Sequence, residues 1–477
     1  MVYDVVIAGA GVIGAMVARE LCHYRLSVCL LEKENDVAMG ASKANSGIIH
    51  GGFDPEPGTL KARLNVEGVP LLYEAAAELH VPHARNGSLV VAFGAEEEPV
   101  LHTLYERGRQ NGVPDLRLMT GEEARALEPK LSGEVTAALL VPGAGIICPY
   151  ALTVAAVGNA MDNGAVLQRN FEITQIDRDS GLFTVTSAAG DRVRGRYFVN
   201  CAGAYADRIA ALCDDRFFDI IPRAGEYLLL DKTEGKTVSH TVFQVPTANG
   251  KGILVTPTAD GNLLLGPTAQ RVPEPDDTVT TAEGLGQVTA LARKSVPSVN
   301  TRAVITSFSG VRASTPGGDF ILQRSEKLPQ LIHAAAIDSP GLSSCVAIAR
   351  YTVGLLREAG LETPENPAFD GHREDTLAFR RMTDDEKDAY IRQHPAYGRI
   401  ICRCETVSEG ELLDALHRNP KALDVDGVKR RTRSGMGRCQ GGFCSPYIMK
   451  LIAREAGIPM TEVTKKGRDS RMLTGKL

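Results

Sequence analysis

The chain opens with Asp4-Val5-Val6-Ile7-Ala8-Gly9-Ala10-Gly11-Val12-Ile13-Gly14 and, after a helical segment, reaches Leu30-Leu31-Glu32-Lys33. The apolar run before the first glycine predicts a buried parallel strand, and residues 15–21 and 27–31 predict a helix and a second strand. A βαβ unit with this Gly-x-Gly-x-x-Gly turn is typical of dinucleotide binding, because the helix N-terminus and its free N–H groups face the pyrophosphate.

Each residue of this motif has an expected task. Gly9 permits the tight turn, Gly11 lets the backbone approach a pyrophosphate, and Gly14 lets the helix and strand pack closely. Glu32 ends the second strand, where its carboxylate can accept hydrogen bonds from ribose hydroxyls. The alternative is an ordinary βαβ turn that binds no nucleotide.

The composition is that of an ordinary soluble globular protein. With 477 residues the length predicts about three domains, and the chain is 43% hydrophobic and 23% charged. A net charge of -5 gives no reason to expect binding of nucleic acid or of an anionic membrane. No apolar run approaches the ~20 residues of a membrane span, and no charged leader precedes the first strand, so we expect a cytoplasmic protein without a transmembrane segment.

The ten cysteines divide into two groups. Six are scattered singly through apolar segments, and four are clustered near the C-terminus. This distribution is typical of a reducing compartment and one site built from cysteine. The single ones are Cys22, Cys29, Cys148, Cys201, Cys213 and Cys345.

The clustered cysteines form two short motifs, Cys402-x-Cys404 and Cys439-x4-Cys444, with 34 residues between them. A structural zinc site is the first alternative, but zinc sites commonly use Cys-x-x-Cys pairs. Glycines inside the second motif favour a [2Fe–2S] cluster, because backbone N–H groups can then turn toward the sulfurs. The basic run at residues 429–433 is suited to offset the charge of such a cluster, or it is a solvated surface.

A stretch of small and polar residues at 40–52 predicts a loop that passes close to a ligand. It contains His50 among glycines, and a histidine readily accepts a proton near neutral pH. Two further segments resemble backbone approaches to a cofactor: the strand at 197–205, which ends in small residues, and the turn at 338–344, which leads into a helix.

Residues 220–325 carry β-type segments and predict a second, sheet-rich domain. Its candidate cationic ligands are Arg223, Lys251, Arg302 and Arg312. Arg312 is favoured, because it ends an apolar strand just before a Pro-Gly-Gly turn. Residues 362–375 have a linker composition, and residues 379–393 predict one charged helix.

These signals together favour a flavin that a small organic substrate reduces and an iron–sulfur cluster reoxidises. A flavin accepts two electrons together as a hydride, whereas a cluster accepts one electron at a time. The two cofactors together therefore convert a two-electron oxidation into one-electron transfers. A nicotinamide is less suitable, since it leaves as a co-substrate and needs no cluster.

Four motifs carry a family resemblance: the glycine turn, Asn45-Ser46-Gly47-Ile48-Ile49-His50-Gly51-Gly52, Gly266-Pro267-Thr268-Ala269 and Asp338-Ser339-Pro340-Gly341-Leu342. Together they resemble the D-amino-acid-oxidase-like superfamily of FAD enzymes, and within it the glycerol-3-phosphate dehydrogenase/oxidase group. Residues 397–446 resemble the bacterioferritin-associated-ferredoxin type of [2Fe–2S] module, as appended to anaerobic glycerol-3-phosphate dehydrogenase subunits.

The resemblance implies an α/β fold with three parts. The Rossmann-like FAD-binding domain takes residues 1–80, 146–215 and 328–363, and a β-sheet-rich substrate domain takes 81–145 and 216–327. After a linker at 364–396, residues 397–466 form a small α-rich [2Fe–2S] domain.

The resemblance also implies the site residues. His50 would take the hydroxyl proton of the substrate, and Arg312 and Lys251 would hold its anionic group. Cys402, Cys404, Cys439 and Cys444 would ligate the cluster. FAD contacts are expected at Gly9, Gly11, Gly14, Glu32, Lys33, Ser42, Asn45, Ser46, Gly47, Gly203, Gly341, Leu342 and Ser343.

One departure concerns the phosphate. Aerobic dehydrogenases of the group continue after His-Gly-Gly with an Arg-Tyr-Leu-like run, whereas Phe53-Asp54-Pro55 follows here. A phosphate ligand from that position is therefore not expected. His50 could instead tether the flavin covalently, as histidines nearby do in some relatives.

We therefore expect an FAD-dependent dehydrogenase that oxidises glycerol 3-phosphate, a small anionic substrate, and passes electrons through the cluster to a partner protein subunit. One alternative keeps the machinery but oxidises L-2-hydroxyglutarate or another 2-hydroxy or amino acid. The other alternative is an electron-transfer subunit whose flavin serves the chemistry of a partner.

Overall fold

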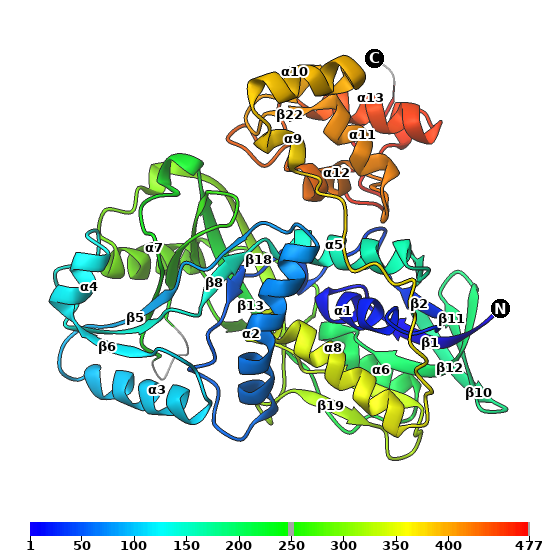
Figure 1. Ribbon diagram of the computed structural model, residues 1–477, viewed down its shortest axis with the longest axis horizontal. Coiled ribbons are helices and arrows are strands. Elements are labelled where there is room, and N and C mark those ends of the chain that lie inside the picture. The colour runs from blue at the N-terminus through cyan, green and yellow to red at the C-terminus, as the bar shows by residue number, and fades with distance from the viewer. Residues whose placement is uncertain (247–251, 476–477) are drawn as a thin grey trace.

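The computed structural model describes residues 1–246 and 252–475 (Figure 1). Two large sheets form the body of the molecule, and a small helical domain at the C-terminal end lies over helix α5 (Pro149–Asp162). No helix of the described residues combines the length and the apolar character that crossing a bilayer requires.

The first sheet contains the predicted βαβ unit. β1 pairs in parallel with β2 and with β12, and α1 (Val12–Leu21) connects β1 to β2, which confirms the predicted order of strand, helix and strand. The sheet runs in the order β10-β11-β12-β1-β2-β9, with β20 also pairing with β12 and β19 with β20. Its strands are β1 (Val2–Ala8), β2 (Val28–Leu31), β9 (Val166–Gln168), β10 (Ile173–Asp179), β11 (Leu182–Ser187), β12 (Arg192–Asn200), β19 (Ile321–Arg324) and β20 (Leu331–Ala335).

Alternate residues of β1 face two cores. Val5 and Ile7 pack into a core with α1, α5, α2 (Leu60–Glu78) and α8 (Gly341–Glu358), which cover one face of the sheet. Val6 and Ala8 pack on the other face, against the β10–β11 hairpin and α6 (Ala206–Leu212). Burial on both faces explains why residues 5–8 of β1 form a continuous apolar run.

The second sheet has nine strands and forms the body's other half. It runs β17-β13-β16-β15-β14-β5-β7-β6, and β18 pairs antiparallel with β13 along almost its whole length. Its strands are β5 (Ser88–Ala92), β6 (Arg117–Thr120), β7 (Ala137–Val141), β13 (Ile221–Leu230), β14 (Thr241–Gln244), β15 (Leu254–Pro257), β16 (Leu263–Gly266), β17 (Gln270–Arg271) and β18 (Val304–Ser314).

Helices cover this sheet as well. α3 (Glu98–Gln110) and α4 (Gly121–Leu127) lie beside its β5–β7 end, and α4 begins with a capping box formed by Thr120 and Glu123. The helix α7 (Ala282–Ser295) was not predicted, and it lies within the segment 220–325 for which β-type segments were expected. Thr281 caps it, but two glycines and an exposed charged face weaken its sequence pattern.

A short three-stranded sheet joins the two halves through β3 (Ile48–Ile49), β8 (Gly145–Ile147) and β4 (His83–Ala84). β3 and β8 pair antiparallel, which fixes the loop before His50 against the body.

The C-terminal domain has its own apolar core, formed mainly by α11, α12 and α13. The segment 379–393 is helical as predicted, but it is divided in two, since α9 ends before Met382 and Thr383 starts α10 with a capping box to Glu386. The elements are α9 (Ala378–Arg381), α10 (Asp384–Gln393), β21 (Ile400–Cys402), β22 (Val407–Ser408), α11 (Glu409–His417), α12 (Val425–Thr432) and α13 (Ser445–Ala456).

Candidate active site and cofactor sites

A cavity of about 2100 Å³ lies where the two sheets and the C-terminal domain meet. The carboxyl ends of β1, β2 and β20 contribute Ala8, Leu31 and Ala334, the edge at which α/β sheets bind ligands. The second sheet contributes Tyr227 and Arg312 among others. The volume and its position suit a dinucleotide with space for a small substrate.

The glycine turn is built as its sequence predicts. Gly9 has φ +98°, and a Cβ there would lie 2.6 Å from the carbonyl oxygen of Cys201. A Cβ on Gly14 would lie 2.0 Å from the Gly9 oxygen, so helix and strand need glycine to meet. Gly11 faces the cavity, where the nearest atom to a Cβ is Ser42 Oγ at 3.3 Å. The turn therefore leaves its open side toward the cavity.

Glu32 is buried at the cavity edge. Its carboxylate accepts hydrogen bonds from the N–H groups of Ala10 (2.9 Å) and Glu34 (3.0 Å), and burial raises its pKa. Lys33, next along the chain, lies over the ring of Tyr205 with its Nζ 3.8 Å from the centroid. Both side chains are fixed by the protein before any ligand is bound.

The loop after the second strand is held by its own polar side chains. Ser42 Oγ accepts from the N–H of Val12 at 2.8 Å, which ties the loop to the N-terminus of α1. Asn45 donates to the Ala41 oxygen and accepts from the Gly47 N–H, while Ser46 Oγ lies 3.3 Å from Tyr227 OH. Gly47 has φ +64° and no room for a Cβ against the Ile147 oxygen. All four predicted residues line the cavity.

The remaining predicted cofactor residues also line the cavity. Gly203 has open space where a Cβ would be, and Gly341, Leu342 and Ser343 form the first turn of α8. Ser343 Oγ accepts from the N–H of His50 at 2.6 Å. The helix N-terminus and the histidine loop are therefore directly joined.

His50 is buried at the cavity wall, which places it in an aromatic setting that its glycine neighbours in the sequence do not indicate. Its ring stacks on Phe53 at 4.7 Å and meets the edge of Phe243 at 6.0 Å. Its Nδ1 accepts from the Gly52 N–H at 3.3 Å, and its carbonyl accepts from Asn65. Aromatic packing and backbone bonds fix the ring.

The cavity floor on β13 and β18 has three successive cross-strand pairs. Tyr227 and Phe308 stack at 4.8 Å, and Gly225 lies opposite Gly310. Arg223 lies opposite Arg312, and both line the cavity. Side chains directly opposite in an antiparallel pair share one face of the sheet.

The glycine pair makes room for neighbours. A Cβ on Gly310 would lie 1.8 Å from the Ala44 oxygen, so the loop at 41–45 crosses the floor there. A Cβ on Gly225 would lie 2.9 Å from Arg312 Nη2, and both terminal nitrogens of Arg312 donate to the Thr268 oxygen at 3.4 Å.

The four predicted cationic ligands are not all in one place. Arg302 lies on the exposed turn η4 (Thr301–Ala303) and does not line the cavity, so it does not join Arg223 and Arg312. Lys251 lies outside the described residues.

The four clustered thiols form two pairs that cross the sequence motifs. Cys404 Sγ lies 3.6 Å from Cys439 Sγ, near the roughly 3.7 Å expected for two thiolates on one tetrahedral metal. The second pair is Cys402 with Cys444: a hydrogen bond from Cys444 lowers the pKa of Cys402 to about 5, and that bond raises the pKa of Cys444.

This arrangement bears on the choice of metal. Among the residues that the structure describes, no three His, Cys, Asp or Glu side chains converge to hold one ion. A single zinc ion needs three or four converging ligands, whereas each iron of a [2Fe–2S] cluster takes one pair of thiolates. Two separate pairs fit the cluster. The six single cysteines are buried, and burial raises the pKa of each.

A buried ion triad joins the two parts of the molecule. Asp36, in the loop after β2, accepts from Arg430 and Arg431 of α12 at 2.5 and 2.8 Å. Burial alone would raise the pKa of Asp36, but the two guanidinium groups outweigh it and hold the pKa below its ordinary value. The basic run expected to offset the cluster's charge thus binds the FAD-side loop.

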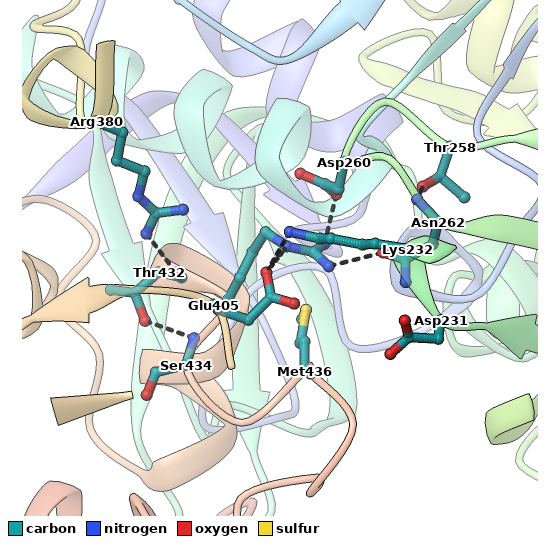
Figure 2. Close-up of polar contacts among 12 residues, drawn as sticks. Asp231, Lys232, Thr258, Asp260, Asn262, Arg380, Glu405, Thr432, Ser434 and Met436 are labelled. Atoms are coloured by element: carbon teal, nitrogen blue, oxygen red, sulfur yellow. Dashed lines mark hydrogen bonds and ion pairs between the residues drawn. The ribbon is translucent and has the colours of Figure 1, made fainter. Parts of the chain in front are cut away.

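Arg433 is the centre of a second joint. Its guanidinium pairs with Asp260 at 2.6 Å and Glu405 at 2.9 Å, and it donates to Asn262 at 3.0 Å. Lys232 also binds Glu405, at 2.9 Å. Figure 2 shows Glu405 from the C-terminal domain reaching toward Asp260 and Lys232 of the body.

The loop between these joints and the cluster borders the cavity. Met436 and Gln440, on either side of Cys439, both line it. The two joints could not be predicted from the sequence, because Asp36 and Asp260 are ordinary loop acids until the fold brings Arg430, Arg431 and Arg433 to them.

The fold and the two cofactor sites define a flavin-dependent oxidoreductase with an iron–sulfur domain. The chain belongs to the FAD dependent oxidoreductase family, whose model matches residues 4–355. The model of the BFD-like [2Fe-2S] binding domain matches residues 400–454. The protein thus binds FAD and a [2Fe–2S] cluster, the cluster that the cysteine spacing favoured over zinc.

Individual relatives narrow the comparison from the family to particular enzymes. The chain is 44% identical over 474 residues to glycerol 3-phosphate dehydrogenase of Caloramator mitchellensis, covering 99% of this chain and 98% of the relative. The FAD-bound L-α-glycerophosphate oxidase of Mycoplasma pneumoniae superposes with a TM-score of 0.74 and 32% identity, over 78% of this chain and 98% of the oxidase. Human mitochondrial L-2-hydroxyglutarate dehydrogenase is 36% identical over 286 residues, 56% of this chain and 61% of that enzyme.

Proposed function

We propose that the protein oxidises glycerol 3-phosphate to dihydroxyacetone phosphate and that the electrons leave through the cluster to a partner acceptor. The relatives support this substrate, since a relative that matches 99% of the chain is a glycerol 3-phosphate dehydrogenase. The observation that carries the proposal is the pair Arg223 and Arg312 on the cavity floor.

Two like charges directly opposite on a sheet destabilise it unless something neutralises them. No carboxylate of the described residues forms an ion pair with either arginine. A phosphate monoester brings two negative charges and three oxygens to one point, and guanidinium groups bind such oxygens in pairs. A dicarboxylate would bring only one charge to the pair, so the site suits phosphate better.

We assign His50 as the base that accepts the hydroxyl proton of the substrate. The substrate hydroxyl loses its proton as its carbon is oxidised, and His50 accepts it from a fixed position in the cavity wall. In the neutral ring, Nδ1 accepts the Gly52 N–H, so the ring proton is on Nε2. For Nε2 to act as the base, that proton must move to Nδ1, and the 3.3 Å bond from Gly52 is then lost. Lys251, which lies outside the described residues, is proposed as a further ligand of the anion beside the two arginines.

FAD would be held by the glycine turn, by Glu32 with Lys33, by the loop from Ser42 to Gly47, and by Gly203 with the first turn of α8. Gly11 and Gly203 offer open backbone to the cavity, and Glu32 offers a buried carboxylate. Bound FAD supplies hydride acceptance and the cluster supplies one-electron transfer. The protein binds and orients the substrate, keeps water out, and moves the proton.

The substrate is tested by steady-state turnover with an artificial dye, using glycerol 3-phosphate and L-2-hydroxyglutarate in parallel. We expect turnover of the phosphate and formation of dihydroxyacetone phosphate. Turnover of the hydroxy acid alone would favour the second candidate, which the similarity to L-2-hydroxyglutarate dehydrogenase supports. Turnover of neither would favour the electron-transfer subunit.

The electron path is tested separately with Cys439→Ser. We expect glycerol 3-phosphate to reduce the flavin of this variant normally, while reoxidation by the partner stops. The six buried cysteines provide a control, Cys213→Ser, which lies far from the cluster in sequence and in the body of the fold. If flavin reduction itself is lost in Cys439→Ser alone, the cluster is structural and the path is wrong.

A further inference from the structure

We propose that an acidic one-electron carrier protein docks on the exposed edge of the C-terminal domain, where the cluster comes nearest to solvent. This inference rests on the proposed function, in which electrons leave through the cluster. The docking edge is defined as Arg399, Arg403, Arg438, Phe443, Tyr447 and Lys450.

The two thiol pairs differ in access to solvent. Cys404 is exposed and Cys439 is half-buried, whereas Cys402 and Cys444 are buried. An electron therefore has its shortest way out beside the Cys404–Cys439 pair. The docking edge lies beside this pair, because Arg403 and Arg438 directly adjoin Cys404 and Cys439 in the chain and the backbone N–H of Phe443 donates a hydrogen bond to the Cys439 thiol.

The docking edge has an apolar centre. Phe443, inside the second cysteine motif, is 84% exposed, and Tyr447, one helical turn later, is 50% exposed. Next to the docking edge, Ile400 at the start of β21 is 43% exposed. Arg399 lies 5.6 Å and Lys450 5.8 Å from the centroid of the Tyr447 ring. An exposed aromatic side chain within a charged rim is the usual composition of a binding hot spot.

The rim presents positive charge because its ion pairs are asymmetric. Arg438 is 72% exposed and its partner Asp231 only 16%, and Arg399 is 61% exposed against 15% for Glu409. Arg454 also pairs with Glu409 and is 59% exposed. Arg403 and Lys450 are exposed as well. An approaching protein therefore meets the cationic member of each pair, although the chain as a whole has a net charge of -5.

Charge complementarity decides the kind of partner. An acidic carrier gains attraction from every exposed cation of the rim, which raises its rate of association at low salt. A second copy of this chain would bring one cationic rim against another. Each carrier molecule takes up one electron, so two are reduced for each substrate molecule oxidised.

The test uses holoenzyme with both cofactors, reduced chemically so that the outcome does not depend on the substrate. The probe is an acidic flavodoxin, and the comparison acceptors are the basic protein cytochrome c and a small dye. Two changes are made: the double variant Arg399→Gln with Lys450→Glu, and Phe443→Ser. The control is Lys421→Glu, because Lys421 is an exposed cation just before the N-terminus of α12 and is not part of the docking edge.

We expect roughly 10-fold slower reduction of flavodoxin and roughly 10-fold weaker binding by calorimetry for the double variant at low salt, and a loss of this difference at high salt. Phe443→Ser should weaken binding roughly 10-fold or more at all salt concentrations. Dye reduction, the cluster spectrum and the control should be unchanged.

Equal flavodoxin rates and affinities in wild type and both variants would overturn the proposal, as would faster reduction of cytochrome c than of flavodoxin. So would a dimer in solution that Phe443→Ser dissociates. Failure of glycerol 3-phosphate to reduce the wild type would contradict only the proposed function, since chemical reduction bypasses it.

Discussion

At the residue scale, the site depends on side chains that the fold holds ready. His50 is the clearest case, with its ring stacked on Phe53 and its backbone tied to Ser343 and Asn65. The histidine and its loop could be singled out from the sequence, since a lone histidine among glycines is unusual for a core. Its aromatic packing could not, because Phe243 comes from a distant strand.

Replacing His50 with alanine should lower turnover by roughly 10²–10⁴-fold, the usual contribution of a general base, while FAD stays bound. Anaerobic flavin reduction and the flavin-to-protein ratio measure the two effects. His102→Ala, on the exposed side of α3, is the control. Full turnover in His50→Ala would place the base elsewhere.

Arg223→Gln should raise KM for glycerol 3-phosphate by roughly 10–100-fold, because one charged hydrogen-bonding partner of the dianion is lost. The control is Arg271→Gln, because Arg271 on β17 lies opposite Arg223 of β13 but does not line the cavity. Equal KM values for both variants would show that only the general positive field matters. An unchanged KM in Arg223→Gln would remove the arginine pair from the phosphate site.

At the element scale, the first strands and the first helix follow their sequence patterns, since residues 5–8 of β1 are apolar and buried and the glycine turn has a known geometry. α7 was missed because Gly284 and Gly286 lower its helix propensity. Gly284 is needed there, as a Cβ would lie 2.2 Å from Glu226 Oε1, a contact between distant segments that no local pattern reveals.

The loop at residues 41–45 crosses β18 at Gly310, and this crossing requires a glycine there. Gly310→Ala should cost roughly 1–3 kcal/mol and weaken FAD binding, because the new methyl group would overlap the Ala44 oxygen. Thermal unfolding and FAD release measure this. Gly317→Ala, which has open space around its Cβ, is the matched control. Equal effects of the two changes would mean that the loop does not lie on Gly310.

At the scale of the whole molecule, two joints hold the cluster domain over the flavin cavity. The sequence indicated both cofactors and the order of domains, but not that α12 binds Asp36 or that Arg433 reaches Asp260. Ion pairs between distant segments leave no periodic pattern, so a basic run next to a cluster has several plausible partners. Only the folded chain selects one.

Asp36→Asn should destabilise docking of the C-terminal domain by roughly 3–5 kcal/mol, since two buried guanidinium groups lose their partner. Protease sensitivity at residues 362–377 and chemical unfolding measure it. Asp426→Asn, which breaks only an exposed pair with Lys465, is the control. If both variants resist protease equally, the triad does not hold the domain.

The same triad sets a pH dependence. The pKa of Asp36 is lower in the folded protein than in the unfolded chain, so its stabilisation is present above the unfolded pKa and is lost as pH falls through the folded pKa. The joint should therefore stay closed through neutral and mildly acidic pH and open only in strong acid. Asp36→Asn should remove this acid transition.

The central claim is that glycerol 3-phosphate reduces the bound flavin and that its electrons reach the cluster. An anaerobic stopped-flow absorbance measurement on holoenzyme tests it most directly. We predict that glycerol 3-phosphate bleaches the flavin band at roughly 450 nm first, followed by the cluster absorbance, whereas L-2-hydroxyglutarate has no effect. A flavin that stays oxidised with glycerol 3-phosphate, or that bleaches only with the hydroxy acid, would contradict the account.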